Sequence, residues 1–220
     1  MTGADASAYH WYPATPQEEA RGDGALRPIA QTVFGSVAWQ LRHLMGVRCV
    51  AFDWDGTAYR GDPPPNDAAR VDWAWCREHV SWDFVELARA LDACGIKLAV
   101  ASYSDPAVIS PEVLSGEAFV GAVLRQCFGR GTPASPERWT LLCRFTSDGK
   151  IWHLRELCRQ SCPRLTESSL LLIDDVRENA DTWTRCGARA LHVDTAGQGF
   201  RIEPLVRWLE SQVTLTPPVL

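Results

Sequence analysis

The sequence predicts an α/β fold: a three-layer, Rossmann-like parallel sheet with helices on both faces and no large cap domain. Short, β-rich apolar segments alternate with segments of helical periodicity. Each strand segment is a nearly continuous apolar run, which is typical of parallel strands that are covered on both faces. The 220 residues, 46% of them hydrophobic, are enough for one domain with a sizeable core.

The ends of the chain differ in composition from the middle. Residues 1–26 are polar and small without a period, and we expect a flexible tail. In residues 27–46, apolar side chains recur every four positions, which predicts a helix packed on the core and ended by Gly46. The domain itself is expected over residues 47–212, and residues 213–220 form a C-terminal tail.

The first strand is expected at Val47–Phe52. Residues 58–80 are expected to form a loop or flap, because Pro63–Pro65 fit neither a central strand nor a helix interior. A short hairpin is expected in this flap through Val71, Trp73 and Trp75. Three further strands are expected, at Ile96–Ala101, Leu170–Ile173 and Ala190–Val193. Between successive strands and after the last one we expect five helices. They are a helix capped by Ser81 and ended by Gly95, a helix near 111–128, a helix from Lys150 capped by Ser147 or Asp148, a helix over 176–186 and a last helix over 203–212.

Composition excludes several classes of protein. Lys and Arg number 22 against 27 Asp and Glu, and a net charge of −5 argues against nucleic acid or an anionic membrane as partner. No apolar run approaches the roughly 20 residues of a membrane span, and the N-terminus does not resemble a secretory signal. The eight cysteines are scattered without a CxxC motif, so we expect reduced thiols in a cytoplasmic protein. Cys76 and His79 have ligand-like spacing, but no second pair completes a zinc site.

Four features stand at strand ends or helix starts. Asp53 to Thr57 (DWDGT) follow the first strand, Ser102 the second and Asp174-Asp175 the third, while Lys150 opens a helix. Because ligands bind at the carboxyl ends of the strands in an open α/β sheet, we expect these residues to gather at one edge. Each alone is usually a cap, a turn residue or a solvated lysine. The ordered set of types indicates a functional site.

The gathered carboxylates would repel one another unless a cation neutralised them. Mg²⁺ suits one or two carboxylates together with phosphate oxygens. Lys150 at a helix N-terminus and the Ser102 hydroxyl favour a phosphoryl group. Asp53 could attack phosphorus to form an aspartyl-phosphate, and Asp55 could protonate the leaving oxygen and later deprotonate water.

These residues resemble motifs one to four of the haloacid dehalogenase (HAD) superfamily, over roughly residues 47–212. The stretches Gly149–His153 and Asp174–Asn179 are similar to the magnesium-dependent phosphatase-1 group, which lacks a large cap. The resemblance implies that Asp53 is the nucleophile and a Mg²⁺ ligand, and that Asp55 is the general acid/base with a carbonyl ligand to the metal. It also implies that Ser102 and Lys150 hold the phosphoryl group. Asp175 is expected to bind Mg²⁺ directly with Asp174 behind it, although the sequence leaves their order open.

The chain departs from the family pattern at two positions. Trp54 stands where a small aliphatic residue is usual, and Tyr103 stands where that phosphatase group has an arginine. We expect Trp54 and Tyr103, with Trp73 and Trp75 of the flap, to wall an open site. This favours a substrate with an aromatic group beside the phosphate, such as an aryl phosphate or phosphotyrosine.

The predicted function is Mg²⁺-dependent hydrolysis of a phosphomonoester, either a phosphorylated small molecule or a phosphoprotein. The alternative is a catalytically idle scaffold that binds a partner through its Trp-rich flap. A signalling receiver domain is disfavoured, because its acidic pair comes first in the chain and here it comes last. Dehalogenation is disfavoured because it needs no acid at Asp55.

Overall fold

The computed structural model describes residues 32–61, 71–103, 116–129, 134–161 and 164–214. The tail predicted at residues 1–26 and the proline run Pro63–Pro65 lie outside these residues. Most of the C-terminal tail predicted at 213–220 also lies outside them, and its first two residues belong to the last helix.

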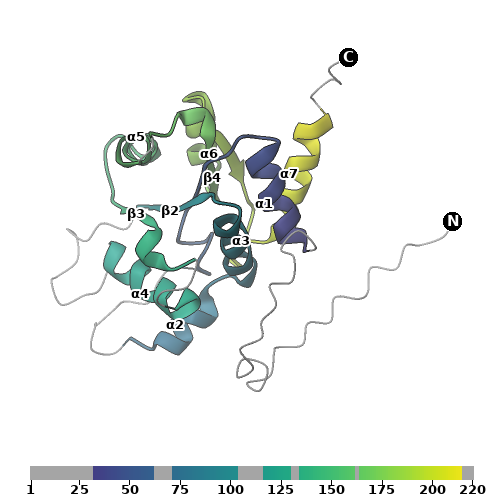
Figure 1. Ribbon diagram of the computed structural model, residues 1–220. Helices are drawn as coiled ribbons and strands as arrows, with labels where there is room; N and C mark the ends of the chain where they lie inside the picture. Colours follow the sequence, from purple (N-terminus) through teal and green to yellow (C-terminus); the bar gives the residue numbers. More distant parts are fainter. Residues whose placement is uncertain (1–31, 62–70, 104–115, 130–133, 162–163, 215–220) are drawn as a thin grey trace, which may run out of the picture.

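The centre of the fold is a five-stranded parallel sheet with the order β3-β2-β1-β4-β5, drawn in Figure 1. The central strand pairs on both sides, since Cys49 lies opposite Lys97 of one neighbour and opposite Leu170 of the other. The residues that follow β1 therefore lie between the ends of two other strands. The strands are β1 (Cys49–Phe52), β2 (Lys97–Ser102), β3 (Thr140–Cys143), β4 (Leu170–Asp174) and β5 (Arg189–His192).

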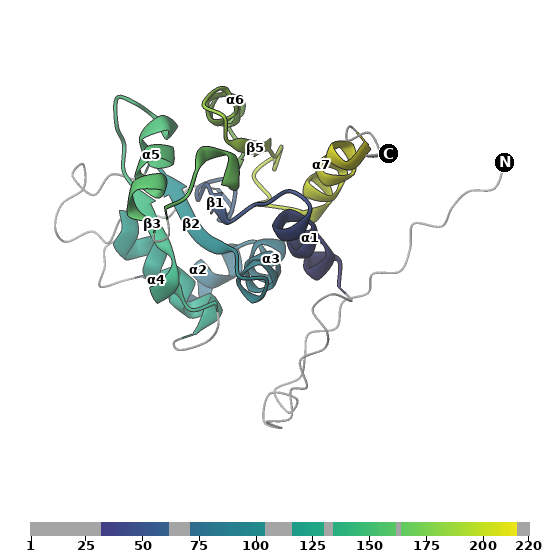
Figure 2. The same ribbon diagram turned by 45° about the horizontal axis from the view of Figure 1, so that its top comes forward.

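Helices cover both faces of the sheet, as Figure 2 shows. Side chains alternate along β1: Val50 and Phe52 join the core with α1, α3, α4 and α7, whereas Cys49 and Ala51 pack with α5 and α6. The three-layer fold predicted from the sequence is confirmed. The helices are α1 (Val33–His43), α2 (Trp73–His79), α3 (Trp82–Ala93), α4 (Gly116–Phe128), α5 (Lys150–Gln160), α6 (Arg177–Arg185) and α7 (Ile202–Thr214), with short 3-10 turns at Pro136–Arg138 and Glu167–Ser169.

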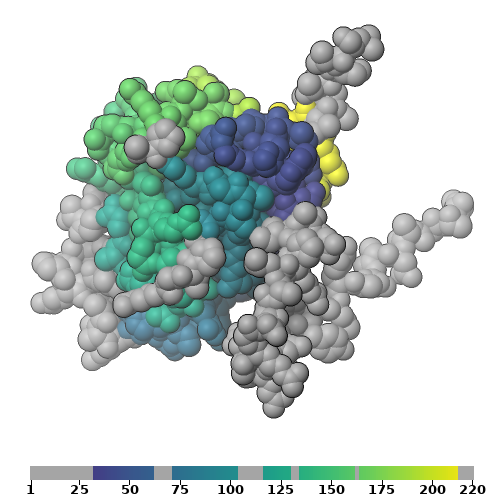
Figure 3. Space-filling view, in the orientation of Figure 1, coloured from purple at the N-terminus to yellow at the C-terminus, as the bar shows by residue number. Residues whose placement is uncertain are grey.

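Helix caps explain several boundaries. The Thr32 hydroxyl accepts a hydrogen bond from the Gly35 amide and begins α1. The Ser81 hydroxyl caps α3 as predicted and also donates to the Phe200 carbonyl at 2.5 Å, which ties α3 to the segment before α7. The space-filling view shows α1 (purple) adjoining α7 (yellow) on the surface (Figure 3). None of the described helices is long and apolar enough to cross a membrane.

Three expectations about local structure are wrong. Residues 73–79 form α2 rather than a hairpin, because the Asp72 carboxylate caps the helix at the Trp75 amide and Cys76 is buried. A fifth strand, β3, was not predicted. Helix α5 begins after Gly149, and neither Ser147 nor Asp148 is its N-cap. The cysteines of the described residues form no disulfide.

Candidate active site

The acidic residues predicted to form a site meet at the carboxyl end of the central strands. Asp53 follows β1, Asp174 ends β4 and Asp175 comes next. These three side chains each present an oxygen within 4.8 Å of the others. The pairing of β1 with β4 brings them together, because Phe52 lies directly opposite Ile173.

Lys150, the first residue of α5, inserts its side chain into this group. Its Nζ lies 2.5 Å from Asp53 Oδ1 and 3.2 Å from Asp174 Oδ2, and it also donates to the Ala101 carbonyl. The residue is 1% exposed. Burial works against the charged ammonium, but Asp53 and Asp174 outweigh it and raise the Lys150 pKa. An ammonium has three N–H donors, so these contacts use all of them.

Burial dominates the titration of the neighbouring carboxylates. It raises the pKa of Asp53 to about 7, against the opposing attraction of Lys150 and with repulsion from Asp174. The pKa of Asp175 is also raised, by burial and then by repulsion from Asp174. One ammonium cannot neutralise three ionised carboxylates, so the group favours a further cation or a bound proton.

The loop after Asp53 is shaped to meet Asp175. Gly56 has a φ of +77°, and a Cβ there would lie 2.4 Å from Asp175 Oδ2, so only glycine fits. The next residue, Thr57, accepts from the Asp175 amide at 3.1 Å and donates to Asp175 Oδ1 at 3.2 Å. The glycine and threonine of the DWDGT motif therefore orient Asp175.

Asp55 lies half-buried on the same loop, and its backbone pairs with that of Tyr59. Trp54, between the two aspartates, turns the opposite way. Because side chains alternate after β1, Asp53 faces α5 while Trp54 enters the core on the other face, where it stacks on Tyr59. Trp54 is 1% exposed and has almost no surface with which to wall a site, contrary to the expectation.

Ser102 is the last residue of β2, the strand next to β1, and is buried. Its carbonyl oxygen lies 3.0 Å from His153 Nε2, and His153 is itself fully buried on α5. Burial and the nearby Lys150 lower the pKa of His153 to about 4. The imidazole is therefore neutral at pH 7, with Nε2 as the donor to this carbonyl.

Two further residues join the site. Asn179 of α6 donates through Nδ2 to both oxygens of Asp174, each at 3.1 Å. Tyr103 donates its hydroxyl to Asn179 Oδ1 at 3.2 Å, and Lys150 Nζ lies 4.8 Å from the centre of its ring. From the sequence, Tyr103 was expected to be a wall of the site, and Asn179 had no assigned role. The signals for Asn179 were its place at the end of the Asp174–Asn179 stretch and its spacing of about one helical turn from the acidic pair.

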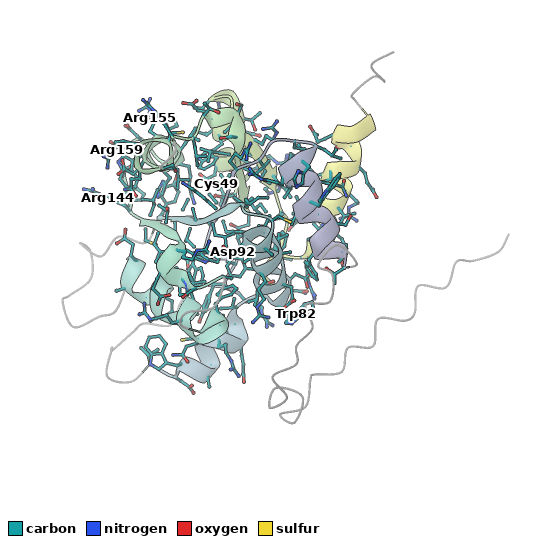
Figure 4. All side chains as sticks on the ribbon, viewed as in Figure 1. Cys49, Trp82, Asp92, Arg144, Arg155 and Arg159 are labelled. Atoms are coloured by element: carbon teal, nitrogen blue, oxygen red, sulfur yellow. The ribbon has the colours of Figure 1, made fainter. Side chains whose placement is uncertain are left out.

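The rim beyond Tyr103 is aromatic and basic. Phe145, which is 63% exposed, packs edge-on against the Tyr103 ring at 5.7 Å. The Arg144 guanidinium lies over the Trp152 ring at 5.7 Å. In Figure 4, Arg144 lies with Arg155 and Arg159 at the α5 side of the molecule. Trp73 and Trp75 lie instead on α2, which packs against α4.

The donor set suits a hard divalent cation. The described residues offer three carboxylates at one point and no sulfur or imidazole ligand among them. Oxygen ligands with excess negative charge fit Mg²⁺. Asp175 and Asp53 are the better placed ligands, because both oxygens of Asp174 already accept hydrogen bonds from neighbouring groups.

Comparison with known proteins finds similarity among solved structures alone. No family model matches the chain, and no curated protein matches it. A solved structure described as a predicted HAD-like family hydrolase from Porphyromonas gingivalis is 12% identical, covers 78% of this chain and 99% of its own, and superposes with a TM-score of 0.38. Nothing in these comparisons supports the particular likeness to the magnesium-dependent phosphatase-1 group.

Proposed function

We propose that the protein is a Mg²⁺-dependent phosphomonoesterase of the HAD type, with Asp53 as nucleophile. The observation that carries the proposal is the buried contact of Lys150 with Asp53, 2.5 Å long, beside the acidic pair Asp174-Asp175. A carboxylate, a fixed cation and further carboxylates at strand ends are the groups that phosphoryl transfer through an aspartate needs. A simple structural ion pair would not need Asp175 and its glycine-dependent contact.

The residues have separate roles in this reaction. Asp53 Oδ1 accepts from Lys150, so we assign the attack on phosphorus to Oδ2. The new Oδ2–P bond forms as the bond from phosphorus to the leaving oxygen breaks, and Asp55 gives that oxygen its proton. Asp55 then takes a proton from water, which attacks the phospho-aspartate, releases inorganic phosphate and restores Asp53. Lys150 and Ser102 offset charge on the phosphoryl oxygens.

Asp53, Asp175 and the carbonyl of Asp55 would hold Mg²⁺, with Asp174 behind them. When bound, Mg²⁺ supplies positive charge that neutralises the carboxylates and draws electrons from the phosphoryl oxygens.

For the substrate, we propose an aryl phosphate or a phosphotyrosine side chain. The support is the exposed Phe145 ring packed on Tyr103, which offers a flat apolar surface next to Lys150. Trp54 has no part in this surface, and Trp73 and Trp75 belong to α2. Comparing kcat/KM for aryl phosphates with that for sugar phosphates, in wild type and Phe145→Ala, tests the assignment. A preference for sugar phosphates would contradict it.

The decisive experiment for the activity is a phosphatase assay of the full chain with Mg²⁺, with EDTA, and with Asp53→Asn as control. Activity that requires Mg²⁺ and Asp53 supports the enzyme. Folded protein without activity on a broad panel of phosphomonoesters favours the alternative of an idle scaffold. Trp75, 37% exposed on α2, would then be the first residue to test for partner binding.

A further inference from the structure

We propose that Tyr103 is a positioning residue: its hydroxyl fixes the side-chain amide of Asn179, and Asn179 in turn holds Asp174 against Lys150. The inference rests on the proposed function, because it concerns how that site is held in its working geometry.

The hydrogen bonds on the two ends of the Asn179 amide run in opposite directions. An amide side chain has one acceptor end and one donor end. Nδ2 of Asn179 donates to both Asp174 oxygens at 3.1 Å, and because a carboxylate only accepts, this fixes the orientation of the amide. The Tyr103 hydroxyl donates to the opposite end of the amide, Oδ1, at 3.2 Å. Tyr103 therefore anchors the free end of the Asn179 side chain in the orientation that serves Asp174.

The Tyr103 ring is itself held in place by its neighbours. Its face lies 4.8 Å from Lys150 Nζ, a favourable distance for a cation and an aromatic ring. Its edge contacts with His153 and Phe145, at 5.8 and 5.7 Å between ring centres, fix its tilt. Gly149 makes room for the hydroxyl, because a Cβ there would lie 3.1 Å from it.

Asp174 is where these constraints meet. Its Oδ1 accepts from the Val176 amide at 2.8 Å and from Asn179, and its Oδ2 accepts from Asn179 and from Lys150. Lys150 also holds Asp53. The contacts from Tyr103 through Asn179 and Asp174 to Lys150 join the residue after β2 to α6, β4 and α5. Loss of the Tyr103 hydroxyl should therefore leave the carboxylates that bind the metal less well oriented, without creating a cavity in the core.

The test is direct calorimetric titration of Mg²⁺ into wild type, Tyr103→Phe, Asn179→Ala and the double variant. Groups that orient metal ligands typically change affinity by 10–100-fold. We expect Tyr103→Phe to weaken Mg²⁺ binding by about tenfold. Because it acts through Asn179, the double variant should bind no more weakly than Asn179→Ala alone. Melting temperatures recorded beside each titration separate this effect from unfolding.

Tyr59→Phe is the matched control, since it removes the same atom from the core on the other face of the sheet. Its Mg²⁺ affinity should equal that of wild type. Wild-type affinity in Tyr103→Phe, or losses that multiply in the double variant, would overturn the positioning role and leave the phosphatase proposal standing. If the wild-type chain binds no Mg²⁺, the proposed function fails and the positioning role fails with it.

Discussion

The Nζ atom of Lys150 lies 2.5 Å from Oδ1 of Asp53, and Lys150 has almost no exposed surface. This contact joins the end of the central strand to the start of α5. It keeps a positive charge beside the carboxylate to which we assign the attack on phosphorus.

Asp53→Asn should abolish turnover and leave the fold intact. The amide keeps the shape of the carboxylate and can still accept from Lys150, but it is no nucleophile toward phosphorus. Steady-state kinetics with circular dichroism as a check of folding measure this. Residual activity above a few per cent of wild type would remove Asp53 from the role.

Asp55→Asn should lower kcat by at least ~10²-fold, the usual scale for a general acid or base. The loss should be smaller for p-nitrophenyl phosphate than for an alkyl phosphate, because p-nitrophenolate needs little protonation. The measurement is kcat for both substrates in both proteins. Equal losses for good and poor leaving groups would contradict the role of Asp55 as the acid.

Asp174→Ala and Asp175→Ala should fail in different ways. The Thr57 hydroxyl holds Asp175, whose carboxylate lies with those of Asp53 and Asp174 at the proposed metal position, so its loss should weaken Mg²⁺ binding more. Loss of Asp174 removes the partner of Lys150, Asn179 and the Val176 amide, so it should lower the melting temperature more. Titration calorimetry and thermal unfolding test the pair, and the reverse order in both would exchange their assignments.

His153 should make the folded state sensitive to acid. Its pKa is lowered to about 4 in the folded protein, against about 6.5 in the unfolded chain, so the unfolded chain binds more protons between these values. The contribution of His153 to the free energy of unfolding is complete above pH 6.5 and is lost as the pH falls toward 4. This contribution is on the order of 3 kcal/mol.

His153→Gln keeps a donor for the Ser102 carbonyl and removes the titration. Its free energy of unfolding, from urea denaturation at pH 7 and pH 5, should therefore change less with pH than that of wild type. Equal slopes in the two proteins would show that His153 does not carry the dependence.

Much of the fold was predictable because its elements carry local signals. The strands β1, β2 and β4 are largely apolar runs, and Ser81 and Gly95 mark the ends of α3 as expected. The edge strands β3 and β5 are only four residues each and carry weaker signals, and of the two only β5 was predicted. Helix α2 was not predicted, because the preceding proline run Pro63–Pro65 indicated that this region forms a loop.

The carboxylates and Lys150 were predictable because each stands at the end of an element whose place in the sheet follows from topology. The role of Asn179 and the position of Trp54 were harder. Asn179 joins Asp174 to the Tyr103 hydroxyl, which follows β2, and Gly149, just before α5, lies beside that same hydroxyl. Such contacts join residues far apart in the sequence, and no local pattern contains them. Trp54 could have been placed from the alternation of side chains after β1.

Asp53 and Trp54 are neighbours in the chain, yet one faces Lys150 and the other stacks on Tyr59 across the sheet. The peptide unit between them thus belongs both to the candidate active site and to the buried core on the other face of the sheet. A change of backbone angles that suits one of these side chains also moves the other. New activity in this chain would therefore evolve most freely at the exposed rim, at Phe145, whose exchange leaves that peptide unit undisturbed.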